Sequence, residues 1–140
     1  DDDGDGLYDA EEQLIGTGPD NSDTDGDGLP DGLEVTSGTD PRDADSDDDG
    51  LCDGPSNVSG SCVSGEDADA DGLIDLGESD PRRIDTDFGG VDDGDEVLAD
   101  HPSYPMNASD DDTDDDGLSD GSEPGLGTDP KDPDSDDDGR

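Results

Sequence analysis

The 140-residue sequence contains no tryptophan, two tyrosines, one phenylalanine and one histidine, and only five of its side chains are basic. Hydrophobic residues make up 21% of the chain, which is too little for the core of an ordinary globular domain. No stretch approaches the roughly 20 apolar residues that a membrane span requires. Nucleic acid is not an expected partner, because phosphate binding depends on lysine and arginine.

The chain is instead acidic, with 48 aspartates and glutamates and a formal net charge of -43. Such a composition is typical of a disordered polyanion, but here the acids recur in a fixed register. Residues 23–34 read DTDGDGLPDGLE, with acids at the first, third, fifth, ninth and twelfth positions and glycine at the sixth. The register is complete at 1–12, 67–78 and 112–123 and incomplete after Asp45, Asp85 and Asp134. We therefore interpret residues 1–140 as one continuous array of about seven repeats, starting at 1, 23, 45, 67, 85, 112 and 134.

Proline precedes several of these acidic loops by four residues, which predicts stiff, non-helical connectors. Only residues 10–15 and 33–37 leave room for about one helical turn, because Pro124 directly follows Glu123 and Pro81 closely follows the fourth loop. The longer connector 100–109 is a candidate hinge or adhesive contact. The expected fold is an elongated rod of EF-hand-like loops with little regular secondary structure.

The register matches the oxygen ligands that calcium prefers, position by position. Carboxylates would come from the first, third and fifth residues, a backbone carbonyl from the seventh, and a direct or water-mediated ligand from the ninth. The twelfth acid would close the shell with two oxygens, and glycine at the sixth position allows a sharp turn with positive φ. Hard oxygen ligands disfavour zinc and copper, and magnesium prefers a tighter shell. The sequence therefore predicts several Ca²⁺ ions per chain, at least one for each complete loop.

The predicted ligands in the four complete loops are Asp1, Asp3, Asp5, Leu7, Asp9, Glu12, Asp23, Asp25, Asp27, Leu29, Asp31, Glu34, Asp67, Asp69, Asp71, Leu73, Asp75, Glu78, Asp112, Asp114, Asp116, Leu118, Asp120 and Glu123. Those in the incomplete loops are Asp45, Asp47, Asp49, Leu51, Asp53, Glu66, Asp85, Asp87, Val91, Asp93, Glu96, Asp134, Asp136 and Asp138.

Two incomplete loops need separate interpretation. The loop at Asp85 has Gly89 at the fifth position, so it loses one ligand and we expect a water in the gap. The loop at Asp45 has Ser56 at the twelfth position, and an inserted stretch, PSNVSGSCVSG, follows Asp53 and Gly54. Glu66 comes directly after this insertion and could return as the missing closing acid.

Cys52 and Cys62 bracket most of the insertion and are the chain's two cysteines. Their separation across a turn rich in glycine, serine and asparagine predicts a disulfide that closes a hairpin over 52–62. Two free thiols in a reducing cytosol are the alternative. A disulfide implies an oxidising compartment, and dense calcium loops suit extracellular calcium concentrations. Both arguments indicate an extracellular, secreted or cell-surface protein.

The segment DTDGDGLPDGLE followed by GTDPRDADSDDDGL (38–51) resembles the thrombospondin type 3 repeat in its bacterial form. GEDADADGLIDLGESDP (65–81) and DTDFGGVDDGDEV (85–97) resemble repeats of bacterial surface and secreted proteins. The resemblance implies an elongated calcium-dependent array in which ions replace the hydrophobic core. It further implies a structural stalk or spacer without catalysis.

The sequence leaves several functional alternatives open. The chain could be a disordered acidic polymer that sequesters calcium or mineral, a dockerin-like module, or an adhesive module that uses the 98–109 connector. Because it starts at the first position of one loop and stops inside another, it could also be a piece of a longer array, or a unit that joins head to tail into a fibre. No set of residues supports enzyme activity, since paired carboxylates need a pocket that separates their pKa values.

Overall fold

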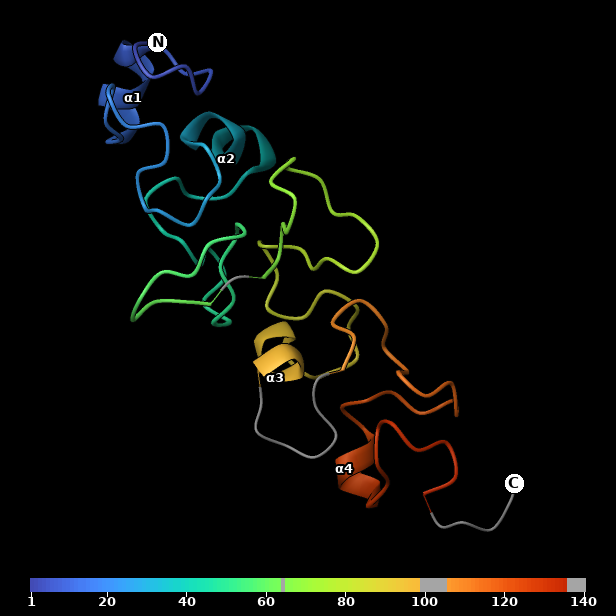
Figure 1. The fold of residues 1–140 in the computed structure, drawn as a ribbon. Helices are drawn as coiled ribbons and strands as arrows, with labels where there is room; N and C mark the ends of the chain where they lie inside the picture. Colours follow the sequence, from blue (N-terminus) through green and yellow to red (C-terminus); the bar gives the residue numbers. More distant parts are fainter. Residues whose placement is uncertain (64, 99–105, 136–140) are drawn as a thin grey trace. The chain divides into compact units, whose positions relative to one another are not determined.

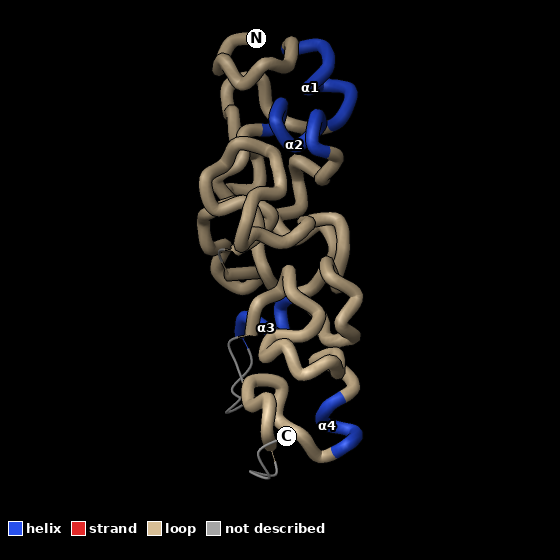
Figure 2. The backbone as a smooth tube through the Cα atoms, turned by 90° about the vertical axis from the view of Figure 1, so that its right-hand side faces the viewer, coloured by secondary structure: helices blue, strands red, loops and turns tan. Residues whose placement is uncertain are grey.

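The structure is a computed structural model that describes residues 1–63, 65–98 and 106–135. Loops and turns make up most of these residues, as the tube in Figure 2 shows. They hold four helices and, within these ranges, no strand beyond isolated bridges. The helices are α1 (Asp9–Ile15), α2 (Asp31–Ser37), α3 (Asp93–Leu98) and α4 (Glu123–Leu126). The predicted scarcity of regular secondary structure is confirmed.

The helix predictions were only partly right. Helices α1 and α2 form where they were expected, but each has seven residues rather than a single turn. The structure also contains α3 and α4, which the sequence analysis did not predict. The prediction that Pro124 excludes a helix at Glu123 was wrong, because Pro124 lies in the first turn of α4. Proline is tolerated there since its missing N–H has no partner within the helix.

The described chain divides into two compact units, residues 1–83 and residues 84–140. The first contains α1 and α2, and the second contains α3 and α4 (Figure 1). Apolar material is scarce: a small cluster in the first unit joins Ala44, Cys52 and Cys62, with Val58 packed against it. Fully buried carboxylates are more numerous than fully buried apolar side chains among the residues described. Within the described ranges, neither unit is therefore organised around an ordinary hydrophobic core.

Successive acidic loops contact each other through glycine at the tenth position. The N–H of Gly32 donates to the Asp5 carboxylate of the first loop (3.1 Å). In the same way, the N–H of Gly54 donates to the Asp27 carboxylate of the second loop (2.6 Å). A Cβ at residue 32 would lie 2.3 Å from the Asp5 carbonyl oxygen, so only glycine lets the two backbones approach this closely.

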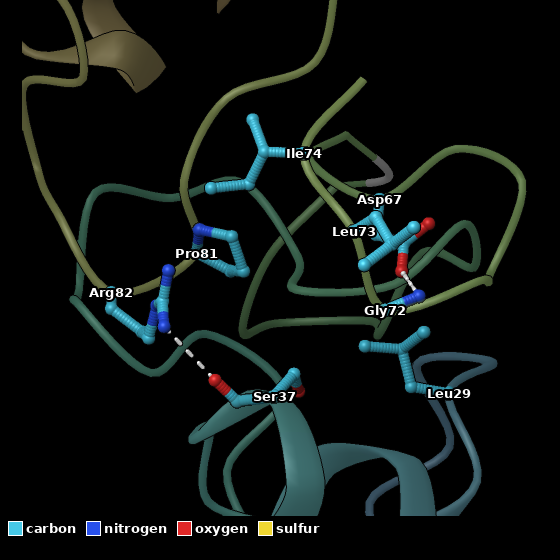
Figure 3. A pocket seen from close by; sticks show the side chains of 8 residues that line it. All are labelled: Leu29, Ser37, Asp67, Gly72, Leu73, Ile74, Pro81 and Arg82. Carbon is cyan, nitrogen blue, oxygen red and sulfur yellow. Dashed lines mark hydrogen bonds between the residues drawn. The ribbon is translucent and has the colours of Figure 1, made fainter.

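Two arginines after the connector prolines reach back to the ends of the short helices. Arg42 donates to the carbonyl of Ile15, the last residue of α1 (3.2 Å). Arg82 donates to the carbonyl of Ser37, the last residue of α2 (3.0 Å), as the dashed line in Figure 3 shows. Cationic side chains suit these positions, because the last carbonyls of a helix lack intrahelical donors.

Candidate metal centres

Aspartates of the register shape the acidic loops by accepting backbone N–H groups, as the second loop shows. In the second loop, Asp23 accepts from Gly26 (2.8 Å), and Asp27 accepts from Leu29 (2.8 Å). The sixth residue, Gly28, has a φ of +101°, as the sequence analysis predicted for the sharp turn. The carboxylate oxygens of Asp23, Asp25 and Asp27 consequently converge to within 4.8 Å of one another. The equivalent aspartates of the first and third loops converge in the same way.

Four of the five twelfth-position glutamates are buried and lack hydrogen-bond donors. Glu12, Glu34, Glu96 and Glu123 are at most 1% exposed, and both carboxylate oxygens of each are buried without a hydrogen-bond partner. In the same four loops, Oδ2 of the third-position aspartate is also buried without a hydrogen-bond partner; these are Asp3, Asp25, Asp87 and Asp114. Buried carboxylates are normally paired, because leaving such a group without a partner is costly.

When no metal ion is bound, the charged form of these glutamates is unfavourable, and their pKa values are raised. Burial, reinforced by the neighbouring Asp25 and Asp27, raises the pKa of Glu34 to about 9. Burial and Asp87 raise the pKa of Glu96 to about 8, and burial and Asp114 raise that of Glu123 to about 7. A cation beside these groups would remove the repulsion and supply the missing partner. Several converging hard oxygens of this kind fit Ca²⁺.

The ninth-position acids have a second role that the sequence analysis missed. Both oxygens of Asp31 accept from Thr24, one from its N–H and one from its hydroxyl, each at 2.7 Å. The same bonds join Asp53 to Ser46, Asp93 to Thr86 and Asp120 to Thr113. Serine or threonine at the second position of the register is the sequence signal for this clamp.

The clamped acid is also directed toward the preceding loop. Carboxylate oxygens of Asp31 lie within 4.8 Å of those of Asp5 and Glu12, both of which belong to the first loop. Likewise, the charge of Asp53 contributes to the raised pKa of Glu34 in the second loop. An ion held by one loop could therefore also be contacted from the next, which was not predicted from the register of a single loop.

The incomplete loops also gather acidic groups. Glu66 is fully buried, and its Oε2 has no hydrogen-bond partner, whereas its Oε1 accepts from the Ser79 hydroxyl (3.0 Å). Burial, with Asp47 and Asp49 as the next causes, raises the pKa of Glu66 to about 9. In the loop at Asp85, the backbone carbonyl of Gly89 accepts the N–H of Gly121 (3.1 Å), where other loops use a fifth-position carboxylate.

The fourth loop, residues 67–78, differs from the other complete loops. The two carboxylate oxygens of Glu78 accept the N–H groups of Ala68 (3.0 Å) and Asp75 (2.8 Å). Asp75 is exposed, and Leu73, at the position whose side chain is buried in the first three loops, is 63% exposed. The register predicts a site here that is equivalent to the others, but the acids of this loop are not gathered around a buried glutamate.

Some predicted positions lie outside the described residues. These are Asp136 and Asp138 of the last loop, together with residues 99–105, which include most of the proposed hinge or adhesive connector. Among the residues described, no helix has the length and apolar character needed to cross a membrane. The predicted disulfide between Cys52 and Cys62 is present.

A pocket of about 190 Å³ lies in the first unit, between α2 and the fourth loop (Figure 3). Leu29, Leu73, Ile74 and Pro81 give it an apolar lining. Asp67 is the one acid among its lining residues, and its carboxylate accepts the N–H groups of Asp71 and Gly72. The acid in this pocket is therefore engaged in shaping its own loop.

These features define a chain of short acidic loops whose buried carboxylates are arranged for cations. Three segments, residues 1–19, 23–44 and 112–133, match the family of bacterial TSP3 repeats, so the chain contains repeats of this family. The family consists of structural calcium-binding repeats that are typical of extracellular proteins and is not a catalytic family. No curated protein and no solved structure matches the chain.

Proposed function

We propose that this chain is a calcium-stabilised structural element, an extracellular stalk or spacer of a bacterial surface or matrix. The observation that carries the proposal is the repeated pair of buried carboxylates, at the third and twelfth positions, with oxygens that lack donors in four loops. Such groups destabilise a metal-free fold and stabilise a calcium-bound one, so ion binding and ordering are coupled.

In the proposed mechanism each ion is bound by oxygens of one loop and is also contacted by an acid of the next loop. The first, third and fifth acids would bind the ion, together with the seventh carbonyl and the twelfth glutamate. Calcium supplies the positive charge that offsets carboxylate repulsion. The ninth acid, fixed by the second-position hydroxyl, faces the preceding loop and would couple neighbouring sites. Units that contact mainly their neighbours build an elongated array, which is the geometry of a spacer.

The test is calcium titration of the chain with parallel measurements of ordering and dimensions. Isothermal titration calorimetry should show several calcium ions per chain, and circular dichroism should change cooperatively and saturate. Small-angle X-ray scattering should give a rod in calcium and an expanded, flexible chain after chelation, with magnesium as the control ion. Gradual compaction without a structural transition would contradict the stalk and support the acidic polymer.

Head-to-tail association into a fibre is a separate part of the proposal. Light scattering at millimolar calcium should then show particles longer than one chain, which dissociate when a chelator is added. Monomers alone under these conditions would eliminate the fibre and leave the single-chain stalk.

A further inference from the structure

The loop that starts at Asp45 does not receive its closing acid from the twelfth position. That residue, Ser56, is exposed, and its N–H donates to the Asp27 carbonyl of the preceding loop (2.5 Å). Glu66, ten residues further on, is fully buried instead, with Oε2 lacking a hydrogen-bond partner. Its carboxylate lies within 4.8 Å of that of Asp49, and the three aspartates of this loop converge within the same distance.

The way Glu66 is positioned differs from that of every other buried closing glutamate in the described chain. Glu12, Glu34, Glu96 and Glu123 are each carried by a short helix, α1 to α4 in that order. A helix that starts within the loop holds its glutamate at a fixed place relative to the loop aspartates. Glu66 lies in no helix, so another part of the structure must position it.

Backbone hydrogen bonds from residues 50–53 to Val63, Glu66 and Asp67 take the place of that helix. Cys52 is at the centre of these bonds: its N–H donates to the carbonyl of Val63 (2.6 Å), and its carbonyl accepts the N–H of Glu66 (3.1 Å). In addition, the N–H of Val63 donates to the carbonyl of Gly50 (3.1 Å), and the N–H of Asp67 donates to the carbonyl of Asp53 (2.9 Å). Gly65 allows the close approach, since a Cβ there would lie 3.1 Å from that of Leu51.

The disulfide closes the insertion at the point where this pairing begins. Cys62 directly precedes Val63 and is bonded to Cys52, whose backbone holds Glu66. Both cysteines are buried with Ala44 in the small apolar cluster. Without the bond, the intervening chain would regain the freedom of an open loop, and the entropy of bringing residues 63–67 back would oppose ion binding.

We propose that the Cys52–Cys62 disulfide is the positioning element of this one calcium site, so that binding here requires the oxidised chain. The inference rests on the proposed function, because it assumes that the loops bind calcium. The four loops closed by a buried twelfth-position glutamate use a short helix for this and contain no cysteine. The chain would therefore contain two classes of site, of which only the one completed by Glu66 depends on the cysteines.

The experiment counts calcium ions on the full chain by calorimetry and by elemental analysis after gel filtration at fixed free calcium. Cys52→Ala/Cys62→Ala and Glu66→Gln should each lose one ion, with the affinity of that site falling roughly tenfold or more. Ser56→Ala is the matched control at the nominal twelfth position and should keep every ion. Adding Glu66→Gln to the cysteine-free chain should cause no further loss, because both changes act on one site.

The outcomes separate this inference from the proposed function. If Glu66→Gln loses an ion but the cysteine-free chain keeps all of them, the positioning role is overturned and the calcium-binding function stands. If the cysteine-free chain loses most of its ions, the disulfide supports the whole fold and the site-specific role is also overturned. If the unmodified chain binds no calcium, the proposed function itself fails.

Discussion

The loops at 23–34 and 67–78 have the same acids in the same register, yet only one gathers them into a buried site. In the first, Glu34 is fully buried on α2 and has no hydrogen-bond donor for either carboxylate oxygen. In the second, Glu78 is partly exposed, and both oxygens accept backbone N–H groups of its own loop. A complete set of acids is therefore not sufficient for a cation site of this kind.

The two loops differ at positions that the ligand register ignores. The second position is Thr24 in one loop, where it fixes Asp31 with two hydrogen bonds, and Ala68 in the other. The tenth position is Gly32, which packs against the preceding loop, or Leu76, which is fully exposed. Burial of the closing glutamate thus accompanies a small tenth residue, whereas a hydroxyl at the second position is not required, since the first loop has Asp2 there and still buries Glu12.

The largest expected effect is on the charge state of the metal-free chain. Because burial raises the pKa of Glu34 to about 9, its metal-free folded form binds a proton that the unfolded form releases above pH 4.5. The resulting stability is fully present below pH 4.5 and is lost as the pH rises toward 9. In the presence of a chelator, the hydrodynamic radius should increase over this range. Calcium should reverse the trend, because it binds the ionised form, and an unchanged radius would contradict the assignment.

Substitution of the closing acids tests the comparison directly. Glu34→Gln should weaken calcium binding at its site by roughly tenfold or more, since it removes a charged ligand from a buried shell. Glu78→Gln is the matched control and should change calcium affinity less than about twofold, because its carboxylate is engaged by its own backbone. Calorimetric titration of both variants measures the difference. Equal losses would show that the fourth loop binds calcium in the same way.

Substitution at the tenth position tests the packing between loops. Gly32→Ala should lower the free energy of unfolding in calcium by about 1–3 kcal/mol, because the new methyl group overlaps the Asp5 carbonyl. Leu76→Ala, at the same position of the fourth loop, should change it by less than about 0.5 kcal/mol, as an exposed residue should. Urea unfolding at saturating calcium gives both values. A tolerated Gly32→Ala would refute the close contact.

The smallest effect is expected at the second position. Thr24→Val removes the hydroxyl donor to Asp31 at similar volume and should lower stability in calcium by about 1 kcal/mol. Ala68→Thr, the reverse change in the fourth loop, should gain less, since Asp75 is exposed and Glu78 already accepts the N–H of residue 68. Thermal unfolding in calcium compares the two. A larger gain at residue 68 would mean that the hydroxyl alone restores the buried arrangement.

Much of the local structure follows from sequence. The spacing of acids and glycines predicts turns in which aspartates accept backbone N–H groups, and the sixth-position glycines that the structure describes have the expected positive φ. The scarcity of regular structure and the disulfide were also predicted correctly. Helix α4 was not predicted, because Pro124 was expected to exclude a helix, whereas proline opposes helix interiors and not the first turn. The roles of individual residues as calcium ligands stay predictions, and the calcium titrations described above test them.

The sequence by itself determined the chemistry: regularly spaced hard oxygen ligands, stiff turns and too little apolar material for a conventional core. Only the tertiary structure decided which of these acids become buried together, as with Glu66 and Glu34, and which remain at the surface, as with Asp75. The physical reason is that local spacing fixes the shape of one loop. Burial of a carboxylate depends on what a neighbouring segment places over it.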